Sequence, residues 1–489
     1  MTFVARCARS PFVLSILFCL VAGLWWGSAQ FAASSVANKV NHPAQPVTAS
    51  PNKSLAVQGD GVSPHAFDWR KRGGNDAAYQ RALARACQMP AASEPFGIGG
   101  VWASLGPDKP ALADDPCQNL KSLTARGLLT AEGRVPFTSG ALSGDGASLW
   151  GASEQGLWRV SAEGDWQLAA RGTMSTVVVD PQDAQTLYAM REGLSLQRSR
   201  DGGQTFTEIW RAATDEGLAR APLALSAEQV PQLWTGGRAL WRSLDGGLHW
   251  QQASPRLVQS EQDGISALAI SPTETNLVLA GASNGAIYRQ RVAMTAAWQT
   301  NWEVAQPRAG FVSSLVIDPQ TGVVYATYAT FGGAHVWRST DNGASWTAID
   351  GVGAAALPDV PVHALVIDPS QPQRIFLGTD LGVFVSPDGG QHWQWDRSGV
   401  GAVPVEAMLG RQAGAQANLY AFTRGHGVWR LNLAAAEPEQ NCDYTLTPYV
   451  QSFEVAGGSG NIDVAVRTGS NCVWTARSEV DWIKLNTNS

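Results

Sequence analysis

Carboxylates are the side chains in this sequence most able to do chemistry, because cleavage of a glycosidic bond needs two of them on opposite sides of a groove. Several acids fall outside the repeated pattern described below and could pair, among them Asp263, Asp359 and Glu406. Their spacing in the chain does not determine the distance between them. Two carboxylates roughly 5–10 Å apart in an open groove would favour a hydrolase, whereas a channel without paired acids would favour a binding protein.

Histidine and cysteine do not form a metal-binding pattern. The seven histidines never fall at the spacing of metal ligands, and His249 and His392 flank turns. The six cysteines contain no pair at zinc-finger spacing. No glycine-rich stretch opens a helix after a strand, so none predicts a phosphate-binding loop. The sequence therefore predicts no metal and no cofactor.

The scaffold that must position these acids is predicted from composition first. The chain has 489 residues and a net charge of −6, with 16% charged residues, 51 glycines and 20 tryptophans. Few charges disfavour a coiled coil or a charge-rich disordered chain. A mildly acidic protein lacks the basic face that nucleic acid requires. These values indicate a β-rich globular protein that does not bind nucleic acid.

The N-terminus has the pattern of an export signal. Arg6 and Arg9 precede the uncharged run Phe12–Trp26, and small residues follow up to Ala29. Residues 1–29 are therefore predicted to be a signal peptide cleaved near Ala29. The alternative is an uncleaved anchor, because the two tryptophans that end the run suit a membrane interface. Both interpretations place the protein outside the cytoplasm, in the periplasm, at the cell surface or in the medium, and the anchor is its only predicted membrane contact.

Residues 30–98 are predicted to form a flexible tether followed by one short helix. Tyr79, Leu83 and Cys87 recur every four residues on one helix face. Outside the cytoplasm cysteines tend to pair, so we expect a disulfide between Cys87 and Cys117. Two separate buried thiols are the alternative.

The strongest pattern is the octet Ser-x-Asp-x-Gly-x-x-aromatic, which occurs four times with starts 44, 96 and 47 residues apart. A hydrophobic run that ends in Asp-Pro or Ser-Pro keeps the same period. A repeat of ~45 residues is the size of a four-stranded propeller blade. The octets supply Ser199, Asp201, Gly203 and Phe206; Ser243, Asp245, Gly247 and Trp250; Ser339, Asp341, Gly343 and Trp346; and Ser386, Asp388, Gly390 and Trp393.

The residue types in each octet suit a tight turn. The aspartate can accept hydrogen bonds from the backbone of its own turn, and the glycine can adopt a positive φ. The aromatic residue can fill the space between adjacent sheets. Side chains engaged in local backbone bonds are not available for chemistry, so we assign these residues a structural role.

With these octets the chain resembles the BNR, or Asp-box, family of β-propellers. The resemblance covers about residues 135–433, and its clearest copy runs from His363 to Trp393. It implies an all-β fold with about seven blades, in a domain over residues 99–433. The last blade lacks an outer strand, and residues 100–107 look like that strand. We expect them to pair with the last blade and close the ring.

The C-terminus resembles a BACON domain, a small immunoglobulin-like β-sandwich often attached to secreted carbohydrate-active or surface proteins. The resemblance rests on the segments that begin at Cys442, Phe453 and Cys472, and on Asp481-Trp482-Ile483. Residues 442–489 are fewer than the ~100 of a seven-stranded sandwich, so a partial domain is expected. The facing strands of such a sandwich imply a Cys442–Cys472 disulfide.

Two classes of protein share these repeats. Sialidases use a tyrosine nucleophile, and Arg134-Val135-Pro136 is similar to a sialidase motif. Four of the eight tyrosines nevertheless recur at one repeat position, which indicates a structural role; they are Tyr188, Tyr288, Tyr325 and Tyr420. Xyloglucanase-type hydrolases use two carboxylates but are two fused propellers. Photosystem II assembly factors and sortilin-type receptors use similar repeats without catalysis.

We therefore predict an exported, non-enzymatic propeller that acts as a binding scaffold for a protein or carbohydrate ligand. A glycoside hydrolase of sialidase or xyloglucanase type is the alternative. The predicted ligand-binding positions share one register on the innermost strands, where side chains would face the channel. The alternative is that they only satisfy backbone groups near the channel mouth. They are Ser139, Ser175, Ser266, Ser313, His363 and Glu406.

Overall fold

The computed structural model divides into two units, residues 1–61 and 62–489, and every described residue belongs to the second. The described residues are 76–89, 102–106, 117, 135–160, 165–191, 194–212, 221–226, 231–272, 274, 277–291, 301–413, 416–433, 445–447 and 465–467. The predicted signal segment, most of the predicted tether, Cys442 and Cys472 lie outside them. Within these residues no helix is long and apolar enough to cross a membrane.

Seven four-stranded antiparallel sheets form the described propeller. We number the blades in chain order. Blade 1 contains β2 (Phe137–Leu142), β3 (Leu149–Ser153), β4 (Gly156–Val160) and β5 (Trp166–Arg171), and blade 2 contains β6 (Met174–Val179), β7 (Leu187–Arg191), β8 (Ser195–Ser199) and β9 (Thr207–Arg211). Blade 3 contains β10 (Leu223–Leu225), β11 (Leu233–Gly236), β12 (Leu240–Ser243) and β13 (Gln251–Gln252), and blade 4 contains β14 (Ile265–Ile270), β15 (Leu277–Ala282), β16 (Ile287–Arg291) and β17 (Glu303–Ala305). Blade 5 contains β18 (Val312–Ile317), β19 (Val324–Tyr328), β20 (Val336–Ser339) and β21 (Thr347–Ala348), and blade 6 contains β22 (Val362–Ile367), β23 (Ile375–Thr379), β24 (Gly382–Ser386) and β25 (Gln394–Trp395). Blade 7 contains β26 (Val405–Ala413), β27 (Gln416–Thr423) and β28 (Val428–Leu433) with β1 (Ala103–Gly106).

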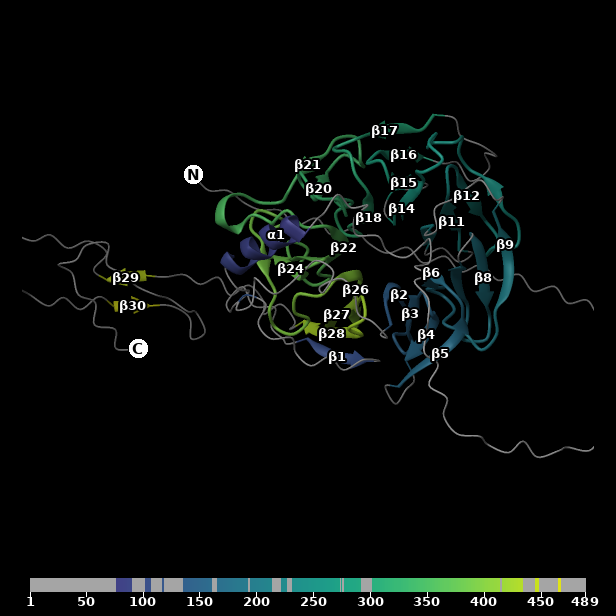
Figure 1. Cartoon of the computed structure of the whole chain (residues 1–489), viewed down its shortest axis with the longest axis horizontal. Coiled ribbons are helices and arrows are strands. Elements are labelled where there is room, and N and C mark those ends of the chain that lie inside the picture. The colour runs from purple at the N-terminus through teal and green to yellow at the C-terminus, as the bar shows by residue number, and fades with distance from the viewer. Residues whose placement is uncertain are drawn as a thin grey trace, which may run out of the picture. The chain divides into compact units, whose positions relative to one another are not determined.

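The first strand of each blade lies innermost, as Figure 1 shows for the strands around the centre of the ring. Each innermost strand contacts the next, and β26 contacts β2, so the ring closes. Every sheet is therefore covered on both faces by neighbouring blades, which explains why β23 and β24 are buried at every position. Glycines allow the close approach between blades. A Cβ on Gly281 would lie 2.4 Å from the Val312 side chain of the next blade.

The ring closes as the sequence predicted, because β1 pairs antiparallel with β28 and completes the seventh blade. Two further bonds fix this closing strand to the blades on either side. Trp102 donates its indole N–H to Asp396 in blade 6 at 2.5 Å, and both side chains are buried. Trp166 of blade 1 donates to the Leu105 carbonyl at 2.8 Å. The closing strand is thus bonded to three blades at once.

Antiparallel order gives the ring two different ends. We call the end formed by the first turn of each blade and by the Asp-box turns the box face; it includes Asp180 and the octets at 199–206, 243–250, 339–346 and 386–393. We call the opposite end the loop face. It is formed by the loops between the second and third strands of each blade and by the loops between blades, for example at Glu154, Asp380 and Arg424.

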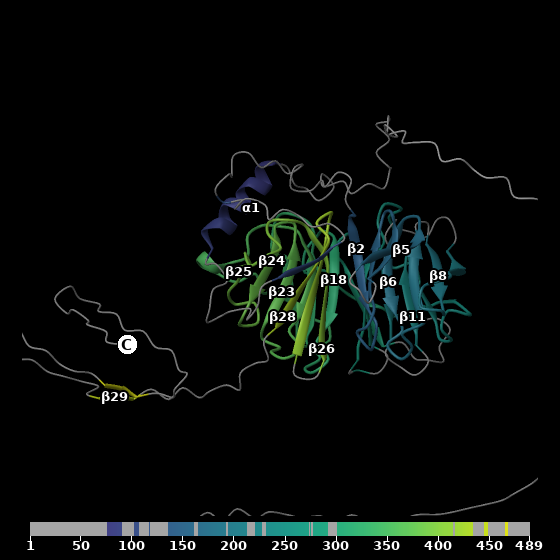
Figure 2. The ribbon, with the colours of Figure 1, turned by 90° about the horizontal axis from the view of Figure 1, so that it is seen from below.

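The predicted helix is α1 (Asp76–Gln88). Figure 2 shows it at one end of the propeller strands. Tyr79 and Leu83 are buried, and Leu83 belongs to the apolar cluster that contains Leu381 of blade 6. A disulfide joins Cys87 at the end of this helix to Cys117, as predicted.

The C-terminal sandwich was predicted for residues 442–489, of which the structure describes only two short strands. These are β29 (Thr445–Thr447) and β30 (Ala465–Arg467), which pair antiparallel with each other. Two paired strands do not define an immunoglobulin-like sandwich. The partial BACON domain and its disulfide remain predictions.

Candidate functional site

On the box face the octet side chains bond to their own turns. Asp388 accepts backbone hydrogen bonds from Gln391 at 3.1 Å and His392 at 2.9 Å, while Ser386 donates to Asp388 and accepts from the Gly390 amide. The other three octets have the same Ser–Asp and Ser–Gly bonds. These contacts leave the octets little freedom for ligand chemistry.

The charge of an octet is shaped by the same bonds. Burial acts to raise the pKa of Asp245, but hydrogen bonds from the His249 amide, the His249 ring and Ser243 outweigh it. Together they hold that pKa at about 2. The carboxylate therefore stays ionised while it holds the turn.

Three of the four octets also accept a hydrogen bond from an arginine of the preceding blade, a contact that we call the arginine clasp and that was not predicted from the sequence. Arg198 of blade 2 donates to the Gly246 carbonyl in the octet of blade 3 at 2.9 Å, and Tyr188 donates to the same oxygen at 3.1 Å. Arg159 of blade 1 makes the matching bond to Gly202 at 3.2 Å. Arg198 directly precedes the octet serine Ser199, a signal that could have predicted its contact, whereas Arg159 precedes no octet serine.

The predicted channel positions lie near the loop face, where a first strand begins. Five of them are bulged residues that the ladder skips: Ser175, Ser266, Ser313, His363 and Glu406. Ser139 was placed wrongly in this register, because the bulge of β2 falls one residue earlier at Thr138 and Ser139 pairs with Ala152. A bulge turns one extra side chain away from the regular alternation.

Three of the bulged hydroxyls link an innermost strand to the next one. The bonds run from Thr138 to the Ser175 carbonyl at 3.1 Å, from Ser266 to Val312 at 2.7 Å, and from Ser313 to Val362 at 2.6 Å. Ser175 instead donates to Met190 of its own blade at 3.3 Å. These contacts match the alternative considered from the sequence, in which the hydroxyls satisfy backbone groups.

The two ionisable members of the set occupy adjacent blades and have charged partners. His363 Nε2 lies 2.7 Å from Asp380 Oδ1, and both side chains are buried. The other oxygen of Asp380 accepts the Tyr79 hydroxyl of α1 at 2.6 Å. A chain of polar contacts therefore runs from the innermost strand of blade 6 to the helix.

Glu406 lies beside an arginine at the seam between blades 7 and 1. Arg424 Nη1 donates to Glu406 at 3.2 Å, and Nη2 donates to Glu154 of blade 1 at 3.4 Å. Glu406 is 5% exposed and Glu154 38% exposed at the side chain. One nearly buried guanidinium thus holds two carboxylates from different blades.

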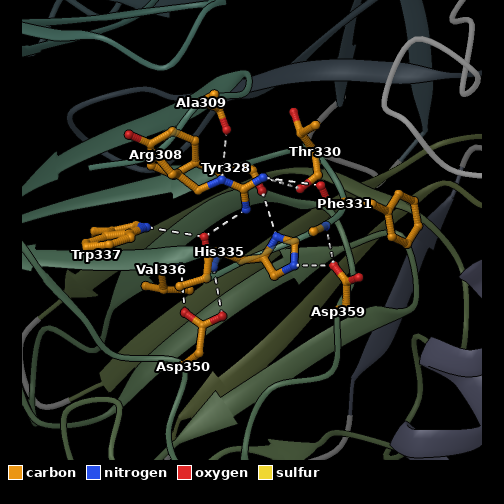
Figure 3. A network of polar contacts seen from close by, with 12 residues as sticks. Arg308, Ala309, Tyr328, Thr330, Phe331, His335, Val336, Trp337, Asp350 and Asp359 are labelled. Atoms are coloured by element: carbon orange, nitrogen blue, oxygen red, sulfur yellow. Dashed lines mark hydrogen bonds and ion pairs between the residues drawn. The ribbon is translucent and has the colours of Figure 1, made fainter. Parts of the chain in front are cut away.

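A network at blades 5 and 6 fixes the loop of residues 330–335 on the loop face (Figure 3). Arg308 donates to the carbonyls of Thr330, Phe331 and Ala334. Its guanidinium also lies 5.3 Å from the centre of the Tyr328 ring. One cation therefore gathers three carbonyls of the loop.

Two acids hold the amide groups of the same loop. Asp350 accepts the backbone N–H groups of His335 at 2.7 Å and Val336 at 2.8 Å. Asp359 accepts the Gly332 amide at 2.8 Å and lies 2.9 Å from His335 Nε2, as Figure 3 shows. His335 is 1% exposed, whereas Asp359 is 54% exposed at the side chain. The loop is therefore anchored through its amides as well as its carbonyls.

The acids of the loop face differ in their pKa. Burial raises the pKa of Asp350, and it raises that of Asp396. Burial acts in the same direction on Asp359, but the His335 ring, the Gly332 amide and the charge of Arg308 hold its pKa below the usual value. Asp263, the third acid singled out from the sequence, accepts the Ser283 hydroxyl at 2.7 Å.

The four tyrosines do not all share one position. Tyr188, Tyr325 and Tyr420 lie on second strands, but Tyr288 lies on β16, the third strand of blade 4, so the predicted common register was wrong for it. Blade 4 lacks an octet, which removes the marker for its third strand. The described part of the chain contains no group of three His, Cys, Asp or Glu side chains able to hold a metal ion.

No protein-family model and no curated protein matches the chain. The fold is similar to that of several solved structures at low identity. They include a GH74 enzyme from Niastella koreensis (TM-score 0.48, 19% identity, 62% of this chain and 53% of that one), a GH74 xyloglucanase from Xanthomonas campestris (0.47, 19%, 68% and 53%), and YCF48 bound to D1 peptide (0.49, 15%, 71% and 98%). The chain covers about half the length of the two GH74 structures.

Proposed function

We propose that this chain is an exported, non-enzymatic binding scaffold that receives its ligand on the loop face. The ring supplies a rigid frame, and the loops between its strands supply the contact surface. A propeller alone implies no function, so the proposal depends on how the ionisable groups of that face are bonded.

The proposal rests on the pKa and the hydrogen-bond partners of the acids on the loop face. A general acid for glycoside cleavage needs a raised pKa and a free proton to donate. The two loop-face acids whose pKa burial raises are bound to structural donors: Asp350 to two backbone amides, and Asp396 to Trp102. Asp359, whose side chain is exposed, has a lowered pKa. This division suits recognition by a fixed charge better than proton transfer.

A polypeptide ligand is favoured over a carbohydrate. Ligand pockets are lined mainly by apolar and aromatic side chains. Among the described residues, the exposed large apolar side chains are Leu248, Val304, Phe311 and Val352, and only Phe311 is aromatic. The loop face instead offers a preformed loop and the exposed carboxylate of Asp359, which suit backbone amides and basic side chains.

The test compares the two faces with matched variants. Purified protein is screened against a random peptide library and a glycan array, and Phe311→Ala is compared with Leu248→Ala. Both residues are exposed apolar side chains, on the loop face and the box face respectively. We expect Phe311→Ala alone to weaken peptide binding by about tenfold, a loss typical of an interface contact. Equal losses from both variants, or no binding to either library, would refute the proposal.

A hydrolase is the second candidate, because Glu154 and Glu406 contact the same guanidinium. A retaining glycosidase needs two carboxylates roughly 5–5.5 Å apart, and an arginine bound to both acids holds them at one place between blades 7 and 1. The test is sugar release from β-glucans and sialosides by wild type, Glu154→Gln and Glu406→Gln. Turnover by wild type that both variants abolish would establish the hydrolase and overturn the scaffold proposal.

A further inference from the structure

The helix α1 is an addition to a ring that is already complete. Each of the seven described blades has four strands, and β1 supplies the last of them. No sheet includes α1, which contacts the loop face through side chains. Its removal would therefore leave every described strand pairing in place.

The contact between α1 and the ring is specific. Tyr79 bonds through its hydroxyl to Asp380 and packs edge-on against Phe331, with ring centres 4.8 Å apart. Leu83, Ala86 and Met89 are buried in the apolar cluster of blade 6. Spacings of four, three and three residues give the helix one continuous docking face.

Asp380, which accepts the Tyr79 hydroxyl, connects the helix to an innermost strand. Asp380 lies in the turn between β23 and β24 and is fully buried, with Tyr79 on one oxygen and His363 on the other. His363 is the bulged residue of innermost strand β22. Departure of α1 would remove the Tyr79 hydroxyl from Asp380 and expose the Asp380–His363 pair.

A covalent latch ends the same helix. Cys87 lies at the last turn of α1 and is bonded to Cys117, and the 30-residue separation encloses the closing strand β1. Arg397 also donates to the carbonyls of Ala86 and Cys87. The helix is thus held at one end by a bond that a thiol can break.

We propose that α1 is a releasable cap on the loop face of blade 6, and that the Cys87–Cys117 disulfide controls its release. A dithiol reductant attacks one sulfur, forms a mixed disulfide and resolves it; the cysteine pair gains two electrons and two protons, and the dithiol becomes a disulfide. Release uncovers Asp380 and His363. That this regulates ligand access rests on the proposed binding function, whereas release itself does not.

The test follows hydrogen exchange in folded wild-type protein with and without dithiothreitol. Reduction should speed exchange in α1 and in the turn at residues 379–383 by about tenfold or more, with strands β14 and β15 unchanged, as expected for local opening. Reaction of diethyl pyrocarbonate with His363 should rise, with the exposed His249 as reference. Unchanged exchange would overturn the proposal, as would faster exchange in every blade, which would make α1 part of the folded core.

A matched pair of variants separates the cap from a general loss of stability. Tyr79→Phe removes the hydroxyl donated to Asp380 and keeps the ring against Phe331, so it should speed exchange in α1 further after reduction. Arg81→Ala changes an exposed residue of the same helix and should have no effect. Equal exchange in both variants would refute the role of Tyr79. A cap that opens without gain of peptide binding would refute only the regulation of ligand access, whereas the Phe311→Ala comparison tests the binding function itself.

Discussion

The two faces of the ring use carboxylates in opposite ways. On the box face each aspartate bonds within a few residues of itself, as Asp201 does with the amides of Gln204 and Thr205. On the loop face the aspartates also have partners that are distant in sequence. Asp380 and Tyr79 are 301 residues apart, and Asp396 and Trp102 are 294 apart.

The octet bonds stabilise single turns, whereas the loop-face bonds hold distant segments of the ring together. An octet can form in an isolated hairpin, because its donors and acceptors lie in the same turn. The loop-face bonds require the whole ring, and burial there makes the loss of one partner costly. The octet therefore recurs in four blades, whereas the long-range acid contacts of the loop face differ from blade to blade, and such differences are where specific recognition can develop.

The largest expected effect comes from the acid that holds the closing strand. Asp396→Ala leaves the indole N–H of Trp102 and the Ser398 amide without their buried acceptor. We expect a loss of about 3–4 kcal/mol, as for a broken buried polar pair. Asp341→Ala on the box face should cost only about 1 kcal/mol, the usual value for a lost cap. Thermal melts measure both, and equal shifts would break the contrast.

The octets and their period predicted the seven blades, because these signals recur in the repeats. The closing strand was predicted because the last blade lacks an outer strand and residues 100–107 look like it. The loop-face pairs could not be predicted in this way. His363 was singled out, but its partner Asp380 lies in a turn without any motif. The register of the first blade failed for a local reason, since Thr138 and Ser139 are both hydroxyl residues and the sequence does not reveal which one is bulged.

The bulged serines offer a second, smaller test of the loop face. Ser313→Ala removes the bond to the Val362 carbonyl of the next blade at 2.6 Å and the contact with Thr327. We expect a loss of about 1–1.5 kcal/mol, the net value of a good hydrogen bond. The box-face control is Ser345→Ala, whose exposed hydroxyl bonds only to its own turn. If Ser345→Ala is as destabilised as Ser313→Ala, the bond between Ser313 and the next blade has no special role.

The arginine clasp sharpens the comparison, because it is a contact between blades on the box face. Arg198→Ala removes the donor to the Gly246 carbonyl, while Tyr188 still bonds to that oxygen. With one donor remaining, the cost should be about 0.5–1 kcal/mol. Arg200→Ala, at an exposed position inside the octet, should leave the melting temperature unchanged. A larger loss from Arg200→Ala would assign the effect to net charge instead of the clasp.

The smallest expected effect is a difference in acid sensitivity between the faces. Asp245 has a pKa of about 2 in the folded protein, below the usual 3.8 of an aspartate, so its contribution is present above pH 4 and is lost as the pH falls toward 2. Burial raises the pKa of Asp396, so its contribution to folding stability has the opposite pH dependence. That contribution is full below the pKa of the unfolded state and declines as the pH rises through the pKa of the folded state. Asp245→Asn should therefore approach wild-type stability as the pH drops from 5 to 2, whereas Asp396→Asn should fall further behind. Because Asp245 is partly exposed, its share should stay below about 1 kcal/mol. Melting temperatures across this pH range measure both differences, and the same sign in the two variants would show that the faces do not differ in this respect.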